Sequence, residues 1–298
     1  MVTRLDLDGT FSPGGLVTKI LKAEPKLKIP IPVEEIAYQL DISEIATLST
    51  DGFEGGLITD ENRTFGAILV KAGVSRQRRR FTIGHELGHF LNVYHKPTES
   101  DQFLCDRAAM RQWDVKTQKK ALKMEAEANR FAALLLMPPP MLRPIIEGKR
   151  YPSLKTVLEI HEHFDVSKEA AARAYAEYNP TLVAVLITRH GKYLRSYRKK
   201  EFPWINLAKG DPVPETSQIH RLSSAGALSD SALTATEQWI ETHYGEPIPK
   251  MYEQVLMQSN GFAMIQLKML KRDEPDYDPN DNLTSKQRFQ RQQERWNR

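Results

Sequence analysis

The stretch RQRRRFTIGHELGHFLNVY, residues 76–94, contains the motif that decides the fold, His85-Glu86-Leu87-Gly88-His89. Apolar and glycine positions recur at spacings of three and four residues from Phe81 to Leu91, which predicts a helix. Four residues are about one helical turn, so the two imidazoles of the motif project from one face. Two imidazoles on one helix face are a typical pair of Zn²⁺ ligands, and we therefore predict that His85 and His89 bind zinc.

Glu86 directly follows the first histidine of the motif. Zinc lowers the pKa of water, and a carboxylate at this position can accept the proton and pass it to a leaving amine. This spacing on a helix is typical of metalloproteases. The sequence therefore predicts Glu86 as the catalytic base.

A catalytic zinc site needs a third protein ligand, and the residues alone leave two candidates open. His95 extends the motif in the manner of metzincins, with Asn92 where a glycine is usual. Glu125 lies on a second predicted helix, MEAEANRFAALLLM (124–137), and Asn129 follows it one turn later. In the second arrangement Asn129 would orient a ligand histidine without binding the metal itself.

The segments around the motif predict further short elements. GGLIT (55–59) and FGAILV (65–70) have the character of strands joined by the turn 60–63. We expect the second strand to lie beside the motif helix, with a free edge that aligns an extended substrate. SLKTVLEIHEHF (153–164) and SKEAAARAYAEY (167–178) predict a pair of helices.

The sequence pattern changes from helical to strand-like at Asn179-Pro180. LVAVLIT and KYLRSYR predict a β-hairpin around the turn His190–Gly191. We expect a helix at Ser231–Tyr244 and a buried strand at 261–270, GFAMIQLKML.

Several of these segments, taken in order, resemble the ImmA/IrrE-type metallopeptidases. The resemblance is carried by RQRRRFTIGHELGHF and EAEANRFAALLLMP, by the upstream IPVEEIAYQL, GFEGGLI and FGAILV, and by the downstream LEIHEHFDVSKEAAARAYAEY. It covers about residues 29–178. The E-x-x-A-N element of the family matches Glu125-x-x-Ala128-Asn129, which implies Glu125 as the third zinc ligand ahead of His95 and Glu127.

The resemblance also implies a function. The family consists of intracellular zinc-dependent endopeptidases whose members cleave or inactivate a helix-turn-helix repressor or an antitoxin, in phage, mobile-element, toxin–antitoxin or stress-response circuits. We expect this chain to act on such a regulator in trans, because its sequence shows no fused helix-turn-helix module.

We expect an α+β fold in which a mostly helical, zincin-like domain with a small sheet precedes an α/β domain. The expected parts are an arm that is loosely attached (1–28), the peptidase domain with its trailing helix pair (29–178), a sensory or regulatory α/β domain (179–271) and a charged, disordered tail (272–298).

Composition narrows the class of protein. The chain has 298 residues, 42 Lys and Arg against 38 Asp and Glu, and a formal charge of +4. Its apolar runs are too short to span a bilayer, so we expect no membrane partner. The single cysteine, Cys105, cannot form an internal disulfide, which favours the cytoplasm.

Two basic segments permit DNA binding but do not favour it. The cluster Arg76–Arg80 precedes the motif helix, and the hairpin combines Arg195 and Arg198 with aromatic residues. For the first segment we expect pairing with nearby carboxylates, and for the second a solvated face of the hairpin.

An alternative function of a different class stays open at this point. The chain would then be a non-proteolytic regulatory protein whose zinc site is structural or sensory and whose C-terminal domain binds protein or DNA. Replacing Glu86 by glutamine separates the two, because only the peptidase needs the base.

Overall fold

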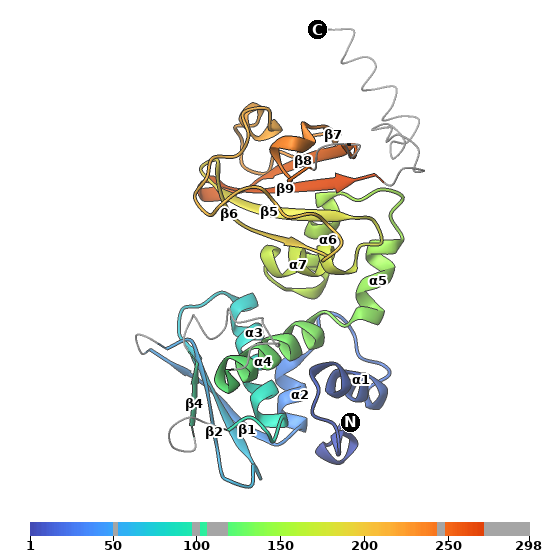
Figure 1. The fold of residues 1–298 in the computed structure, drawn as a ribbon. Coiled ribbons are helices and arrows are strands. Elements are labelled where there is room, and N and C mark those ends of the chain that lie inside the picture. The colour runs from blue at the N-terminus through green and yellow to red at the C-terminus, as the bar shows by residue number, and fades with distance from the viewer. Residues whose placement is uncertain (50–52, 97–101, 106–118, 243–247, 271–298) are drawn as a thin grey trace. The chain divides into compact units, whose positions relative to one another are not determined.

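The computed structural model describes residues 1–49, 53–96, 102–105, 119–242 and 248–270 (Figure 1). By contacts the chain divides into two compact units, residues 1–142 with 160–170, and residues 143–159 with 171–298. The described residues form seven α-helices and two sheets, which makes the fold α+β as predicted.

The first unit contains a four-stranded sheet and the helices that cover it. Its elements are η1 (Arg4–Leu7), α1 (Pro13–Ala23), α2 (Val33–Gln39), β1 (Ile42–Leu48), β2 (Gly55–Thr59), β3 (Gly66–Lys71), α3 (Arg76–Leu91), β4 (Gln102–Cys105) and α4 (Lys120–Leu136). The buried side chains of β2 and β3, Leu57, Ile68 and Val70, lie on one face of the sheet. Helix α3 contacts both strands, so the motif helix is supported by the sheet.

The sheet has the order β1-β3-β2-β4, and it confirms the two strands predicted at 55–59 and 65–70. The prediction of a free edge on the second of them is wrong. β3 pairs in parallel with β1 and antiparallel with β2, so both of its edges are used in backbone hydrogen bonds. β1 escaped prediction because the sequence ISEIATL has no regular alternation of apolar and polar residues.

The N-terminal segment is packed, whereas the sequence suggested a loosely attached arm. Helix α1 is capped by Ser12, whose hydroxyl accepts a hydrogen bond from the Gly15 backbone N–H at 3.3 Å. The buried Ile20 follows the buried Leu16 and Val17 by four and three residues, about one turn, and α1 contacts α4. The short apolar patch is therefore the inward face of an amphipathic helix.

Three helices follow α4: α5 (Pro139–Glu147), α6 (Leu154–Phe164) and α7 (Lys168–Tyr178). The last two confirm the predicted helix pair. Asp165 in their connection has a φ of 50°. Ser167 caps α7 by accepting a hydrogen bond from the Ala170 backbone N–H at 3.1 Å, as its position in the sequence indicated.

The second unit is built on an antiparallel sheet with the order β6-β5-β9-β8-β7. Its elements are β5 (Val183–Arg189), β6 (Lys192–Arg198), η3 (Gln218–Arg221), β7 (Ala232–Leu233), η4 (Thr236–Gln238), β8 (Met251–Met257), η5 (Ser259–Gly261) and β9 (Phe262–Met269). The hairpin and the final strand are confirmed. His190 and Gly191 have φ values of 49° and 70°, the two positive values that a two-residue hairpin turn of type I′ requires.

The helix predicted at Ser231–Tyr244 is wrong over its described part. Ala232–Leu233 pairs with β8, and only Thr236–Gln238 forms a short 3-10 turn. Thr234 accepts a hydrogen bond from the Trp239 indole at 3.0 Å, and Thr236 donates to the Pro249 carbonyl at 2.9 Å. These side-chain bonds and the burial of Trp239 in the core hold the segment in a non-helical conformation.

Two further expectations concern the C-terminal tail and membrane-spanning segments. The tail expected to be disordered, residues 272–298, lies outside the described residues. Among the described helices, none combines the length and the apolar character needed to cross a membrane.

Candidate metal centre

Helix α3 places two histidines of the motif side by side. It begins after Ser75, whose hydroxyl accepts a hydrogen bond from the Arg78 backbone N–H at 3.2 Å. His85 and His89 are fully buried, and their Nε2 atoms lie 3.1 Å apart. Both nitrogens therefore face one common point, as the spacing predicts.

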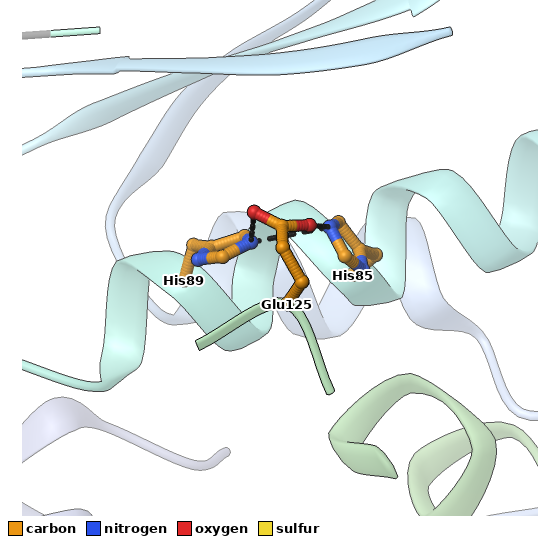
Figure 2. Close-up of side chains that lie close together, drawn as sticks. All are labelled: His85, His89 and Glu125. Atoms are coloured by element: carbon orange, nitrogen blue, oxygen red, sulfur yellow. Dashed lines mark hydrogen bonds and ion pairs between the residues drawn. The ribbon is translucent and has the colours of Figure 1, made fainter. Parts of the chain in front are cut away.

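Helix α4 brings Glu125 to the same point. Its Oε2 lies 3.3 Å from Nε2 of His85, and its Oε1 lies 3.5 Å from Nε2 of His89. Figure 2 shows the carboxylate lying between the two imidazoles. Within the described part of the chain, His85, His89 and Glu125 form a group of three potential ligands whose donor atoms all lie within 4.8 Å of one another.

The spacing of these donors fits a single small cation. Tetrahedral zinc with bonds of about 2.0–2.1 Å holds its ligand atoms about 3.3 Å apart. The two imidazole nitrogens, 3.1 Å apart, lie close to that value, and the two oxygens of Glu125 approach one nitrogen each at 3.3 and 3.5 Å. Two imidazoles and one carboxylate also form a typical set for a catalytic metal, which leaves a fourth position open for water or substrate.

The charges of His89 and Glu125 suit a cation as well. Burial lowers the pKa of His89 to about 3, so its imidazole is neutral at neutral pH. Burial alone would raise the pKa of Glu125, but hydrogen bonds with His85 and His89 outweigh burial and hold it below the ordinary value. Neutral imidazole and ionised carboxylate are the states in which these groups bind metals.

Two glycines on α3 allow α4 to approach closely. A Cβ atom at Gly84 would lie 3.3 Å from the Cα of Ala132, and one at Gly88 would lie 3.3 Å from the Cα of Ala128. Both distances are tighter than ordinary van der Waals contact. The absence of side chains at these positions therefore brings Glu125 within reach of the histidines.

Asn129 lies where it was expected, beside a ligand histidine. Its Oδ1 is 2.9 Å from Nδ1 of His85, and Asn129 is fully buried. An amide oxygen only accepts hydrogen bonds, so Nδ1 of His85 carries the proton and Nε2 keeps its lone pair. That lone pair points toward the group of donors.

The structure does not bring His95 or Glu127 into the group of three. Nδ1 of His95 lies 3.0 Å from Nδ1 of His89, on the edge of that ring opposite to Nε2. The other nitrogen of His95, Nε2, lies 3.0 Å from Oε2 of Glu127. Of the candidates for the third ligand, Glu125 alone joins both Nε2 atoms.

Arg63 shapes the site and was not identified from the sequence. Its guanidinium donates to the carbonyl oxygens of His89 at 2.5 Å, Phe90 at 2.9 Å and Asn92 at 2.7 Å, and also to that of His95. These bonds satisfy the carbonyls left open at the end of α3. Burial lowers the pKa of Arg63 to about 10, so the group stays charged at neutral pH.

Glu86 is fully buried on α3, directly after His85. Its role as the catalytic base stays a prediction. A buried carboxylate in a site of this kind is a candidate for proton transfer.

The arginines expected to precede the motif helix lie in the first turns of α3 and form ion pairs within the first unit. Arg76 and Arg80 approach Asp165 at 2.6 and 3.5 Å, Arg78 approaches Glu54 at 3.3 Å, and Arg79 approaches Glu34 at 3.1 Å. These contacts agree with pairing to nearby carboxylates, which the sequence offered as the alternative to DNA binding.

Comparison with known proteins places these observations in a family. Residues 45–175, which include the motif and Glu125, match the Peptidase_M78 family model, described as the IrrE N-terminal-like domain. The chain is 26% identical over 213 residues to the radiation response metalloprotease IrrE of Deinococcus radiodurans. The alignment covers 72% of this chain and 56% of the length of that relative.

A solved structure shares the fold. It is described as a Mycobacterium tuberculosis transcriptional regulator, and it matches with a TM-score of 0.51 and 10% identity over 89% of this chain and 92% of its own. At this identity the likeness concerns the fold alone. The family match and the metalloprotease relative agree with the resemblance carried by the motifs, and the segment that holds the candidate metal centre therefore belongs to the ImmA/IrrE family of metallopeptidases.

Proposed function

We propose that this protein is a cytoplasmic zinc-dependent endopeptidase that cleaves or inactivates a regulator protein, a repressor or antitoxin with a helix-turn-helix. The observation that carries the proposal is the meeting of His85, His89 and Glu125 at one point, with Glu86 on the same helix. A lone motif gives two ligands and a base, whereas this geometry adds the third ligand that a catalytic site needs.

Zinc is the metal that this donor set favours. Neutral imidazoles and one carboxylate in tetrahedral spacing suit zinc better than calcium or magnesium, which prefer six or more oxygen ligands. When bound, zinc supplies a Lewis acid that polarises a peptide carbonyl and lowers the pKa of water.

Each residue of the chain then has a separate task. His85, His89 and Glu125 hold the metal, and Asn129 fixes the orientation of the His85 ring through its 2.9 Å contact. Glu86 accepts the proton from the attacking water and delivers it to the leaving amine. Its burial keeps this carboxylate out of bulk solvent.

The substrate class rests on the family. ImmA/IrrE-type relatives act on repressors and antitoxins, and the relative in D. radiodurans is described as a radiation response metalloprotease. The single cysteine agrees with a reducing compartment, in which such regulators work.

Substituting Glu86→Gln tests the proposal. The chain and the variant are loaded with zinc and incubated with candidate helix-turn-helix repressors and antitoxins from the same genome, and fragments are followed by mass spectrometry. We expect the variant to keep one zinc per chain while cleavage slows by about 10²- to 10⁴-fold, because the metal remains and the base is lost.

The matched control is Glu34→Gln, which alters a carboxylate paired with Arg79 in the first unit. It is expected to cleave like the unaltered chain. Equal cleavage by Glu86→Gln would contradict the peptidase. Tight binding of the regulator without any fragment, in all three proteins, would favour the non-proteolytic alternative.

A further inference from the structure

The ring of His89 is held on both of its nitrogens. Nε2 faces His85 and the Glu125 carboxylate, at 3.1 and 3.5 Å. Nδ1, on the opposite edge, faces Nδ1 of His95 at 3.0 Å. His95 is 1% exposed, so water does not compete effectively for this contact.

His95 is itself anchored by a carboxylate. Its Nε2 lies 3.0 Å from Oε2 of Glu127, whose side chain is 24% exposed. A carboxylate only accepts hydrogen bonds, so Nε2 of His95 carries a proton and donates it to Glu127. The Nδ1 of a neutral His95 is then an acceptor.

The order of donors and acceptors from Glu127 through His95 to His89 decides which nitrogen of His89 can bind the metal. Because His95 Nδ1 accepts, Nδ1 of His89 donates, and Nε2 of His89 is left with its lone pair. We propose that Glu127 and His95 are positioning residues that fix the orientation and the tautomer of the ligand His89. This inference rests on the proposed zinc site at His85, His89 and Glu125.

The Asn92 amide favours the opposite order, because its nitrogen is a donor that lies next to the same His95 atom as Glu127. Asn92 Nδ2 lies 2.9 Å from His95 Nε2, 3.4 Å from Glu127 Oε2 and 3.3 Å from the Phe11 carbonyl oxygen. A hydrogen bond to an ionised carboxylate is stronger than one between neutral groups, so the His95 proton goes to Glu127. The Asn92 N–H groups are then directed at the two oxygen acceptors. Asn92 and the carbonyl contacts of Arg63 hold the segment after α3 in place.

Helix α4 would thus orient both ligand histidines. Asn129 contacts His85 directly, and Glu127 acts on His89 through His95. The two arrangements differ in one respect that an experiment can use. Asn129 bonds its histidine directly, whereas Glu127 is linked to His89 through the imidazole of His95. Partners of this kind contribute about 10- to 100-fold to metal affinity in other zinc proteins.

Zinc affinity, measured by competition with a chromogenic chelator, is the first test. His95→Phe and Glu127→Ala are expected to bind zinc about 10- to 100-fold more weakly than the unaltered chain. Glu127→Gln retains an acceptor oxygen for His95, so its loss should be smaller. Glu34→Gln, a carboxylate change elsewhere in the first unit, should leave the affinity unchanged.

The double variant separates positioning from general damage. If Glu127 acts through His95, then His95→Phe with Glu127→Ala binds zinc no more weakly than His95→Phe alone. Additive losses would overturn the inference. Chemical denaturation of the metal-free proteins identifies a variant that fails to fold, and His95→Gln then replaces His95→Phe.

Proton NMR of the zinc-loaded full-length chain gives a readout independent of affinity. In the unaltered chain the Nδ1–H signals of both ligand histidines should be protected from exchange. In Glu127→Ala the His89 signal should weaken or shift, while that of His85, bonded to Asn129, stays. An unchanged His89 signal together with unchanged affinity would overturn the inference but leave the zinc site intact. Failure of the unaltered chain to bind zinc would overturn the proposed function instead.

Discussion

Both units of the molecule bury polar side chains, but they use them differently. In the first unit His85, His89 and Glu125 direct their donor atoms to one point. In the second unit Gln254 and Gln266 are also buried, yet their hydrogen bonds diverge.

The partners in the second unit show what its polar groups do. Gln254 Oε1 accepts from the Leu154 backbone N–H at 2.8 Å, and Gln266 Oε1 accepts from the Tyr175 hydroxyl at 2.7 Å. These bonds join the sheet to the chain segments packed on it, and each satisfies a buried group.

The difference teaches that burial alone does not mark a site. A structural polar group completes its bonds with the surrounding chain, whereas the groups of the first unit leave several lone pairs facing a shared position. Changes in the first unit should therefore alter metal binding, and changes in the second should alter stability alone.

We expect the largest effect from Gly88→Val, which should lower both the stability of the fold and the affinity for zinc. A Cβ atom there already lies 3.0 Å from Phe131 Cδ1 and 3.3 Å from the Ala128 Cα, so the branched side chain forces α3 and α4 apart. We expect a loss of about 3 kcal/mol in the free energy of unfolding. Zinc affinity should fall as well, because Glu125 moves with α4.

Circular dichroism during denaturation and chelator competition measure these two effects. Gly14→Ala is the matched control, since a Cβ at Gly14 meets nothing within 4 Å. Unchanged zinc affinity in Gly88→Val would contradict the role assigned to the close helix contact.

The next effect lies in the second unit. Gln254→Leu removes the donor to the Ser229 carbonyl oxygen and the acceptor of the Leu154 N–H, and it leaves that buried N–H without its partner. We expect a loss of about 1–3 kcal/mol in the free energy of unfolding, followed through the fluorescence of buried Trp239. The zinc content should not change. A drop in zinc affinity would contradict the claim that polar groups of the second unit affect stability alone.

The smallest effect is a pH dependence at Glu253. Burial raises the pKa of this carboxyl in the folded protein, although Ser217 donates a hydrogen bond to it at 2.5 Å. The folded protein thus favours the protonated form. This contribution to stability is complete below the unfolded pKa of about 4.5 and is lost as the pH rises through the higher folded value.

Glu253→Gln removes that titration. The difference in unfolding free energy between the unaltered chain and the variant should therefore change above pH 4.5 and be flat below it. Denaturant titrations at several pH values measure it. A difference that is independent of pH throughout would show that Glu253 does not titrate differently on folding.

The predictable parts of the molecule were those set by nearby residues. The helix with His85 and His89, the turn at His190–Gly191 and the cap at Ser167 each follow from spacing or backbone preference within a few positions. The segment Ser231–Tyr244 has an apolar pattern of the same kind, but tertiary contacts of Trp239 and pairing with β8 override it.

The rest of the site depends on long-range contacts. Spacing could not decide between His95 and Glu125, because that choice depends on how α4 packs against α3. Arg63 contacts carbonyls 26 to 32 residues away, and no local pattern in the sequence marks it. The sequence offered Glu127 and His95 as alternative zinc ligands. In the structure His95 contacts the candidate ligand His89, and Glu127 contacts His95.

Crystals of the zinc-loaded chain, measured at the zinc absorption edge, test the central claim most directly. The account predicts one anomalous peak about 2.0–2.2 Å from Nε2 of His85, Nε2 of His89 and the Glu125 carboxylate. His95 should lie outside the coordination sphere, bonded to His89. A peak coordinated by His95 in place of Glu125, or no peak between the two helices, would contradict it.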